Sequence, residues 1–386
     1  MNHRNGHTGR MRTFSPEIDF LLKVARVTMS YAEVDYCREL LMEHTRSFDW
    51  GYFLDQACRH KVIQMAGRNI SEHRLHRGLD GNLLIPSRWI YLDAYTGNKA
   101  RNAVQYKEFA SVLEALNRGK IEYAIRKGPA LTDYTYKDIG LRRMQDLDIL
   151  IKREDLEKVG GILRFCGYIQ GRFNAEGTAI IPFKRSTQAF WKMFVNNDLP
   201  FTKISRQPEV ETYSVDICLN IFMNRSSASV NTAQLLGNRV GATLCGVDSY
   251  MLSPVDNFID LCAHMYKEAT AGFYIQAGSD LQLSKFLDIA LSCRGLAARS
   301  MWPELLESAR EYRATSMVYY ALHHTSLVYP DLMPNVDLDV FRPSNRSYLD
   351  EYGEADGNIR TWDLSFMDRL FSVARDGGAS STIPFD

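Results

Sequence analysis

The sequence predicts an α+β fold, in which a small mixed or antiparallel sheet with flanking helices lies between N-terminal helices and a C-terminal helical bundle. Apolar residues recur at helical spacing before residue 118 and after residue 226. Short apolar runs typical of strands are instead concentrated between residues 121 and 219. The spacing of these runs favours an antiparallel meander over a parallel, doubly wound sheet.

Composition and charge narrow the class of protein. Of the 386 residues, 45% are hydrophobic and 24% are charged, which is ordinary for a globular chain. Lys and Arg number 46, as do Asp and Glu, so there is no overall positive excess to neutralise a nucleic acid, and such a partner is not expected. The seven cysteines form no Cys-x-x-Cys pair, which is typical of reduced thiols. We see neither a signal-type segment nor an apolar run that would span a bilayer, so we expect a cytoplasmic protein with no membrane partner.

These patterns divide the chain into five expected segments. They are a disordered N-terminus (1–14), an N-terminal helical region (15–118), the α+β core (119–225), a C-terminal helical domain (226–334) and a tail with one short amphipathic helix (335–386).

Helix signals fill the N-terminal region. Ser15 followed by Pro16 is typical of a helix start, because Ser caps free N–H groups and Pro suits the first turn. Further on we expect helices at 31–44 and 50–70, a bend or short helix at 86–98, and a helix at 103–118. His60 and Lys61 are expected on the surface of the helix at 50–70.

The core is expected to alternate short strands with one helix. Strands are predicted at 121–125, 146–151, 168–169, 179–183, 189–195 and 213–219. A helix is predicted at 153–165, and a loop at 196–211 that crosses the edge of the sheet.

The C-terminal part is expected to be helical. Helices are predicted at 232–238, 254–268, 280–291, 302–306 and 314–329. In the tail, an amphipathic stretch at 364–373 is expected to dock on the body or on a partner, and residues 376–386 are expected to be mobile.

Three carboxylates are the candidate metal ligands. Side chains alternate along a strand, so Asp146 and Asp148 point to one face. Two carboxylates on one face repel unless a cation lies between them, and Mg²⁺, or Mn²⁺ in its place, prefers oxygen ligands. Asp216, in another strand-like run, would supply a third oxygen ligand if its strand lies beside the first. On an exposed edge strand the same Asp pair would simply face water.

A Lys-Gly pair strengthens the metal interpretation. Gly128 permits a close backbone approach to a phosphate, and Lys127 supplies a mobile positive charge for it. The pair is not a Walker loop, because the second glycine and the Lys-Ser/Thr ending are missing.

These residues together resemble a family of uncharacterised bacterial nucleotidyltransferases, which looks like a divergent branch of the DNA polymerase β-type superfamily. The resemblance covers about residues 50–334. In the core it is carried, in chain order, by Lys127-Gly128-Pro129, Tyr136, Gly140-Leu-Arg142, Asp146-Leu-Asp148, Gly167-Tyr168 and Asp216, and in the helical half by Pro254, Asp256, His264, Lys267 and Asp288.

The resemblance implies a nucleotidyltransferase-type sheet and a role for each acid. Asp146 and Asp148 would hold Mg²⁺ against a triphosphate, and Asp216 would bind the catalytic ion and polarise the attacking hydroxyl. Lys127 and the backbone of Gly128 would face the phosphates.

Other side chains keep two interpretations each. Lys267 would reach the phosphates and His264 would orient a substrate or pack behind the site, unless both lie on a solvated helix face. Arg142 suits a phosphate or one of the acids equally well. Tyr134 and Tyr136 would line a base or acceptor pocket or pack in the core.

The function that follows is Mg²⁺-dependent transfer of a nucleoside monophosphate from a nucleoside triphosphate, with ATP as the expected donor, to an acceptor, releasing pyrophosphate. The acceptor is expected to be a small molecule, a peptide or a protein. The alternative is a catalytically inactive protein that keeps this fold for binding. An intact set of three acids favours the enzyme.

Overall fold

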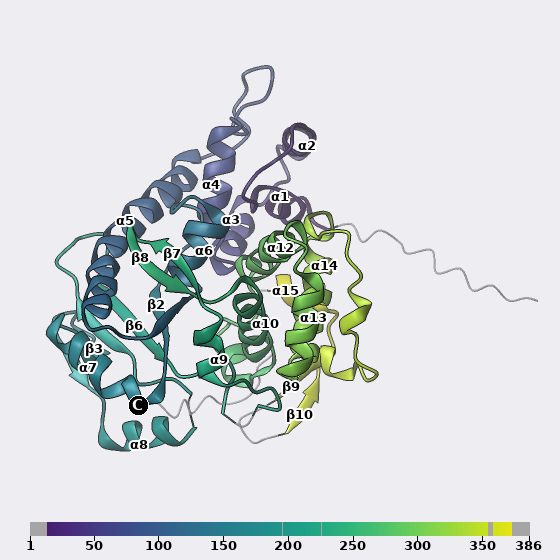
Figure 1. Ribbon diagram of the computed structural model, residues 1–386. Coiled ribbons are helices and arrows are strands. Elements are labelled where there is room, and N and C mark those ends of the chain that lie inside the picture. Colours follow the sequence, from purple (N-terminus) through teal and green to yellow (C-terminus); the bar gives the residue numbers. More distant parts are fainter. Residues whose placement is uncertain (1–13, 195, 225, 354–357, 373–386) are drawn as a thin grey trace, which may run out of the picture.

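A mixed eight-stranded sheet lies at the centre of the computed structural model (Figure 1). The structure describes residues 14–194, 196–224, 226–353 and 358–372. Disorder was predicted for residues 1–14 and mobility for residues 376–386, and residues 1–13 and 376–386 lie outside the described residues. Phe14 is described, and it packs against the core, so the prediction is wrong at that residue. The predicted α+β class with a mixed sheet and flanking helices is confirmed.

The strands pair in the order β4-β3-β5-β6-β2-β1-β8-β7. The pairs β2–β6 and β1–β8 are parallel, and the other neighbours are antiparallel. In chain order the strands are β1 (Tyr123–Arg126), β2 (Asp146–Ile151), β3 (Ile169–Phe173), β4 (Ile180–Pro182), β5 (Phe201–Ile204), β6 (Thr212–Cys218), β7 (Val240–Leu244) and β8 (Val247–Met251).

Helices precede, interrupt and follow the sheet. Those before it are α1 (Pro16–Val24), α2 (Tyr31–Glu43), α3 (Trp50–Arg59), α4 (Ile63–Glu72) and α5 (Arg88–Arg118). Those between strands are α6 (Gly128–Leu131), the π-helical turn η1 (Thr132–Tyr136), α7 (Leu156–Phe165), α8 (Arg185–Phe194) and α9 (Thr232–Gly237). Those after it are α10 (Pro254–Thr270), α11 (Gly272–Gln276), α12 (Leu283–Ala298), α13 (Trp302–Glu311), α14 (Thr315–Val328) and α15 (Phe366–Phe371).

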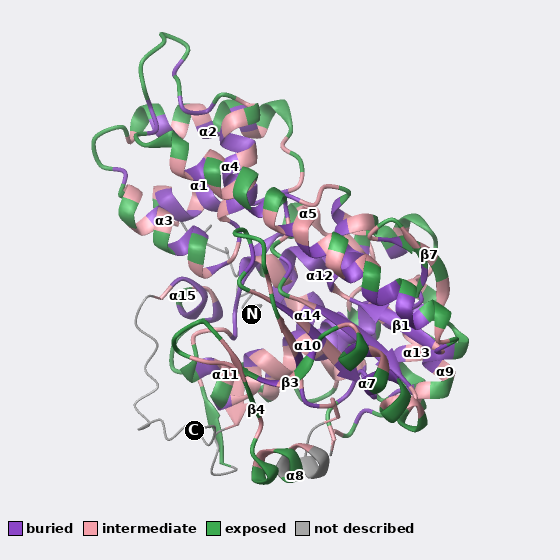
Figure 2. Ribbon diagram, turned by 90° about the vertical axis from the view of Figure 1, so that its left-hand side faces the viewer, coloured by how far each residue is buried: buried purple, intermediate pink, exposed green. Residues whose placement is uncertain are grey.

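Alternation along β2 divides the hydrophobic core into two clusters. Leu147 and Ile149 belong to one cluster with apolar residues of α5 and α7, whereas Leu150 belongs to the other, with residues of α10, α12 and α14. Figure 1 shows α5 and α7 on one side of the strands and α10 and α12 on the other. The central strands are buried on both faces, as the purple colouring near β1 shows in Figure 2.

Two predictions in the middle of the core are wrong. A strand was expected at 189–195, but the described residues of this stretch, 189–194, belong to the helix α8. A short apolar run by itself suits a helix as well as a strand. The loop expected at 196–211 contains β5, which pairs antiparallel with both β3 and β6. Residues 201–204 therefore form an inner strand of the sheet, and the edge on this side is β4.

The hairpin of β7 and β8 was not predicted from the sequence. It follows α9 and lies beyond residue 225, where the core was expected to end. It belongs to the sheet because β8 pairs with β1 in parallel orientation. Its residues form an edge of the sheet, which is why their polar and apolar residues give a weak strand pattern.

The long helix α5 replaces the predicted bend at 86–98 and helix at 103–118 with one element of 31 residues. Asn98 and Asn102 are buried on it, although their side chains are polar. Their amide groups donate hydrogen bonds to backbone carbonyls of Gly140, Ile139 and Arg142. The first half of α5 lacks a clear apolar stripe in the sequence, because its buried face contacts the loop before β2 through polar side chains.

Candidate nucleotide site

The three predicted acids lie side by side on two neighbouring parallel strands. Asp148 on β2 is the register partner of Asp216 on β6, and Asp146 is the partner of Ser214. Because register partners in a sheet share a face, Asp148 and Asp216 point the same way, as does Asp146 two residues before. The condition for Asp216 to join the Asp pair, that its strand lies beside theirs, is met.

These carboxylates lie in an environment that disfavours three negative charges. Burial, with the nearby Asp148, raises the pKa of Asp146 to about 6. Burial, with Asp146 and Asp148, raises the pKa of Asp216 to about 8. Asp148 is 7% exposed, and Oδ1 of Asp216 is buried without a hydrogen-bond partner among the described residues.

Crowded carboxylates and an unpartnered oxygen suit a hard divalent cation. Within the described ranges, no three or more His, Cys, Asp or Glu side chains are arranged to hold a metal ion by themselves. Mg²⁺ keeps several waters and binds substrate phosphates, so the protein needs to supply only part of its ligands. The residues present therefore fit a metal that is shared with a phosphate ligand.

Lys127 and Gly128 form a strained turn against the acids. Lys127 has φ 45° and Gly128 has φ 26°, both in the region that favours glycine. A Cβ built on Gly128 would lie 3.1 Å from the carbonyl oxygen of Asp146. Burial lowers the pKa of Lys127, but Asp148 and Asp260 outweigh it and the pKa is raised, so this lysine is charged beside the acids.

His264 and its neighbours on α10 face the same turn. The Nζ of Lys127 lies 3.0 Å from Nδ1 of His264, and Nε2 of His264 lies 3.1 Å from Oε1 of Glu268. Glu268 also pairs with Lys285 of α12 at 2.5 Å. Lys267 lies on the same helix with Nζ 5.1 Å from the ring centre of Tyr274. The structure thus brings His264 next to Lys127, a contact that the sequence did not predict.

Arg126 and Asp260 attach α10 to the sheet. Arg126 Nε donates to Asp260 Oδ2 at 2.9 Å, and a second guanidinium nitrogen pairs with Oδ1. Both side chains are buried, at 5% and 0% exposed. This pair holds His264, one helical turn further on, over the end of β1.

Arg142 is paired with a different acid from those considered in advance. Its Nη2 lies 3.0 Å from Oδ2 of Asp288 on α12, and its Nε also donates to Asp288. The hydroxyl of Tyr136 donates to the same carboxylate at 2.6 Å, and Tyr136 is buried. Arg142 and Tyr136 therefore join the loop before β2 to α12, and none of the three strand acids is the partner of Arg142.

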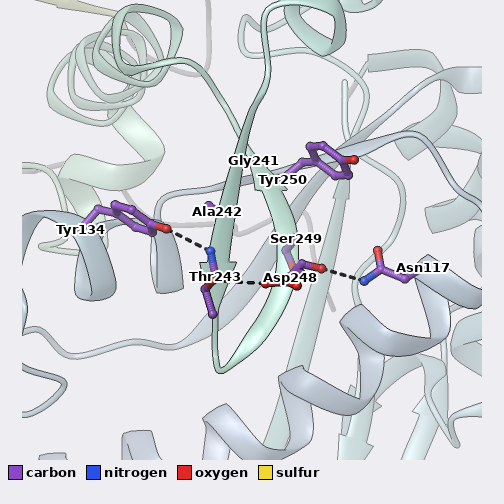
Figure 3. A pocket seen from close by; sticks show the side chains of 8 residues that line it. All are labelled: Asn117, Tyr134, Gly241, Ala242, Thr243, Asp248, Ser249 and Tyr250. Carbon is purple, nitrogen blue, oxygen red and sulfur yellow. Dashed lines mark hydrogen bonds between the residues drawn. The ribbon is translucent and has the colours of Figure 1, made fainter.

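A hollow of about 560 Å³ opens elsewhere, at the β7–β8 hairpin (Figure 3). The hydroxyl of Tyr134 accepts a hydrogen bond from the backbone N–H of Thr243 at its rim. Asn117 at the end of α5 donates to the backbone carbonyl of Asp248 across from it. None of the acids or site lysines lines this hollow, so the candidate site is defined by its side chains and not by this cavity.

The comparison with known families gives one match. Residues 46–330 match a family model described as "Uncharacterised nucleotidyltransferase", which is more than half of the 386 residues. The chain belongs to this nucleotidyltransferase family. No curated protein and no solved structure matches it. Membership assigns the chain to nucleotidyl transfer as a reaction class, and the matched span contains all the residues of the site described above.

Five charged residues around the candidate site were not singled out from the sequence: Lys61, Arg126, Asp260, Glu268 and Lys285. Asp260 carried a signal, because it interrupts the apolar run Phe258-Ile259-Asp260-Leu261, and a buried charge needs a partner. Lys61 carried none, since its surroundings are typical of an exposed helix.

The surface position predicted for His60 is wrong, because His60 is fully buried. Lys61 is half-buried with an exposed hydrogen bond, and it lies at a turn between α3 and α4 with φ 55° and not on a helix face. The predicted single helix over 50–70 ends there, because a left-handed residue cannot continue an α-helix.

Two further observations concern the whole nucleotidyltransferase chain. All seven cysteines are free thiols. In the part of the chain that the structure describes, every helix is too short or too polar to cross a bilayer.

Proposed function

We propose that this nucleotidyltransferase uses Mg²⁺ to transfer a nucleoside monophosphate from a nucleoside triphosphate, with ATP as the expected donor, to an acceptor, releasing pyrophosphate. The observation that carries the proposal is the register of Asp148 with Asp216 on parallel strands, with Asp146 on the same face and Lys127 beside them. A small molecule or a peptide is the favoured acceptor, and free thiols support a cytoplasmic location.

In this proposal the acidic residues bind the metal ion and the basic residues bind the phosphates. Asp146, Asp148 and Asp216 would hold Mg²⁺, or Mn²⁺, which when bound neutralises phosphate charge and makes a hydroxyl more acidic. Lys127 is placed to bind a phosphate oxygen on the other side, and its backbone turn is held against β2 by Gly128. His264 accepts a hydrogen bond from Lys127 and orients that lysine.

Thermal unfolding with each nucleoside triphosphate, with and without Mg²⁺, tests the proposal. A ligand at about a hundred times its Kd stabilises the folded state by roughly 2.7 kcal/mol, which is visible as a shift in Tm. We expect a Mg²⁺-dependent shift for the wild type that Asp146→Asn/Asp148→Asn loses. The matched control is Glu154→Gln/Glu157→Gln, two exposed carboxylates, one in the turn before α7 and one in its first turn, which should keep the shift.

The inactive binding protein is separated from the enzyme by turnover. Release of pyrophosphate from ATP in the presence of candidate acceptors should depend on Asp216. If Asp216→Asn keeps the wild-type rate, or if no nucleotide shifts the Tm with Mg²⁺, the enzymatic proposal fails.

A further inference from the structure

Four lysines from four different elements lie near the end of β1, where each interacts electrostatically with another of the four or with Asp146 or Asp148. They are Lys61 of the α3–α4 turn, Lys127 after β1, Lys267 of α10 and Lys285 of α12. Burial, followed by the positive charge of a neighbouring lysine, lowers the pKa of Lys61 and Lys267. Burial also lowers the pKa of Lys285, although Glu268 acts in the opposite direction. Glu268 pairs with Lys285 and His264, so one carboxylate faces several cations.

A chain of contacts links two of these lysines, Lys127 and Lys285, through His264 and Glu268. Because the Lys127 ammonium can only donate, Nδ1 of His264 accepts from it, and Nε2 carries the proton that is donated to Glu268. Burial and Lys127 lower the pKa of His264 to about 4, so this ring is neutral near pH 7. Lys285 closes the chain, and its Nζ also donates to the carbonyl of Ser279 at 2.6 Å.

The turn that carries Lys61 is attached to α12 on one side. Nδ1 of the buried His60 accepts a hydrogen bond from the N–H of Leu283, and the carbonyl of His60 accepts one from Ser284, both at 3.3 Å. These bonds place Lys61 next to the first turn of α12, where Lys285 lies.

The same turn is attached to the approach of β2 on the other side. Nζ of Lys61 donates to Oε1 of Gln145, the residue before Asp146, at 3.4 Å. The side-chain amide of Gln64 donates to the carbonyls of Lys61 and Leu141, both at 2.9 Å. Lys61 therefore lies between the lysines of the C-terminal helices and the three acids.

Lys61 differs from an ordinary surface lysine in its backbone, while its ammonium group, whose hydrogen bond to Gln145 is exposed, stays accessible to a ligand. Lys61 is half-buried on a backbone with φ 55°, a conformation that costs energy for a residue other than glycine. Within the described ranges it forms no ion pair, and its side-chain partner is a neutral amide. Glu268 and Asp146 act on Lys61 only from beyond ion-pair distance, and the positive charges of Lys285 and Arg142 act in the opposite direction. Its ammonium group is therefore available to an anionic ligand.

We propose that Lys61, with Lys127, Lys267 and Lys285, forms a polyphosphate-binding site, in which the N-terminal helical region supplies a direct contact to the phosphate chain of the nucleotide. The inference deepens the proposed function and rests on it in naming a nucleoside triphosphate as the ligand. The polyphosphate contact itself needs no metal, because the four lysines supply the charge. It assigns the α3–α4 turn, which lies within the family-matched span, to the substrate site.

Binding of sodium tripolyphosphate in EDTA, measured by calorimetric titration at low and high KCl, tests this site. We expect Lys61→Met to weaken binding by about tenfold, the size of one lost charged hydrogen bond, and to flatten its dependence on salt. Lys61→Arg should recover part of the loss. The control Lys158→Met removes an exposed lysine of α7 on the opposite side of the sheet and should bind as the wild type does. Unfolding of Lys61→Met in the absence of ligand checks that the variant is folded.

The outcomes separate this inference from the proposed function. If tripolyphosphate binding depends on Lys61 while the Mg²⁺-dependent nucleotide shift is absent, the lysine site stands and the enzymatic proposal fails. If Mg²⁺-dependent nucleotide binding depends on the acids but folded Lys61→Met binds tripolyphosphate and nucleotide as the wild type does, the inference is overturned. An equal loss in Lys158→Met would also overturn it, because the effect would then reflect overall charge.

Discussion

At the residue scale, Gly128 is a position in the candidate site that does not accommodate a side chain without strain. Its φ of 26° is unfavourable for a residue with a side chain, and a Cβ would lie 3.1 Å from the carbonyl oxygen of Asp146. We expect Gly128→Ala to lower the free energy of unfolding by about 1–3 kcal/mol, because backbone strain and a close contact add. Urea unfolding measures the change.

Gly161 in α7 provides the matched control. It is a helical glycine, and nothing lies within 4 Å of a Cβ built on it. Gly161→Ala should therefore raise the free energy of unfolding by about 0.5–1 kcal/mol. If Gly128→Ala were equally stabilising, the turn would not be strained in the way described.

At the element scale, the attachment of α10 to β1 depends on Arg126 and Asp260. Both are buried, and removing one partner leaves the other charge without compensation. Arg126→Met should lower the free energy of unfolding by about 3–5 kcal/mol, measured by urea unfolding. Arg126→Met/Asp260→Leu should cost less than the single change, because no unpaired charge remains. A double variant as unstable as the single one would show that packing, and not charge, sets the cost.

Element boundaries were predictable where the pattern was local. The starts of α1 and α10 follow from Ser15-Pro16 and Ser253-Pro254, and both serines cap their helices. The identity of α8 and the length of α5 were not, since a short apolar run is ambiguous and the first half of the buried face of α5 is polar. For α5, the loop before β2, which is distant in sequence, accepts the hydrogen bonds of these polar residues.

At the scale of the whole molecule, α15 packs against both the N-terminal helices and the C-terminal helices. The predicted amphipathic stretch at 364–373 docks on the body in its described part: Tyr52 donates to the carbonyl of Phe371, and Phe366 stacks on His324 at 4.2 Å. Leu370 is fully buried in the core shared with the N-terminal helices. The C-terminal helix therefore contributes to the packing of both helical regions.

Leu370→Ala tests this role. It should lower the free energy of unfolding by about 2–5 kcal/mol through lost burial and the cavity left behind. Leu364→Ala, at a position 48% exposed before the same helix, should change it by less than about 0.5 kcal/mol. The measurement is the urea midpoint of each variant. Equal midpoints would mean that α15 is not part of the cooperative core.

By itself, the sequence determined the mixed α+β class, most helices after α9, and the three acids with their Lys-Gly turn. These features follow from local periodicity and from residue types that are costly to bury without a purpose. Only the tertiary structure decided which strands are neighbours, that Arg142 pairs with Asp288, and that Lys61 contacts Gln145, the residue before Asp146. The reason is physical: periodicity and capping act over a few residues, whereas strand neighbours and charge partners are chosen by packing between segments far apart in the chain.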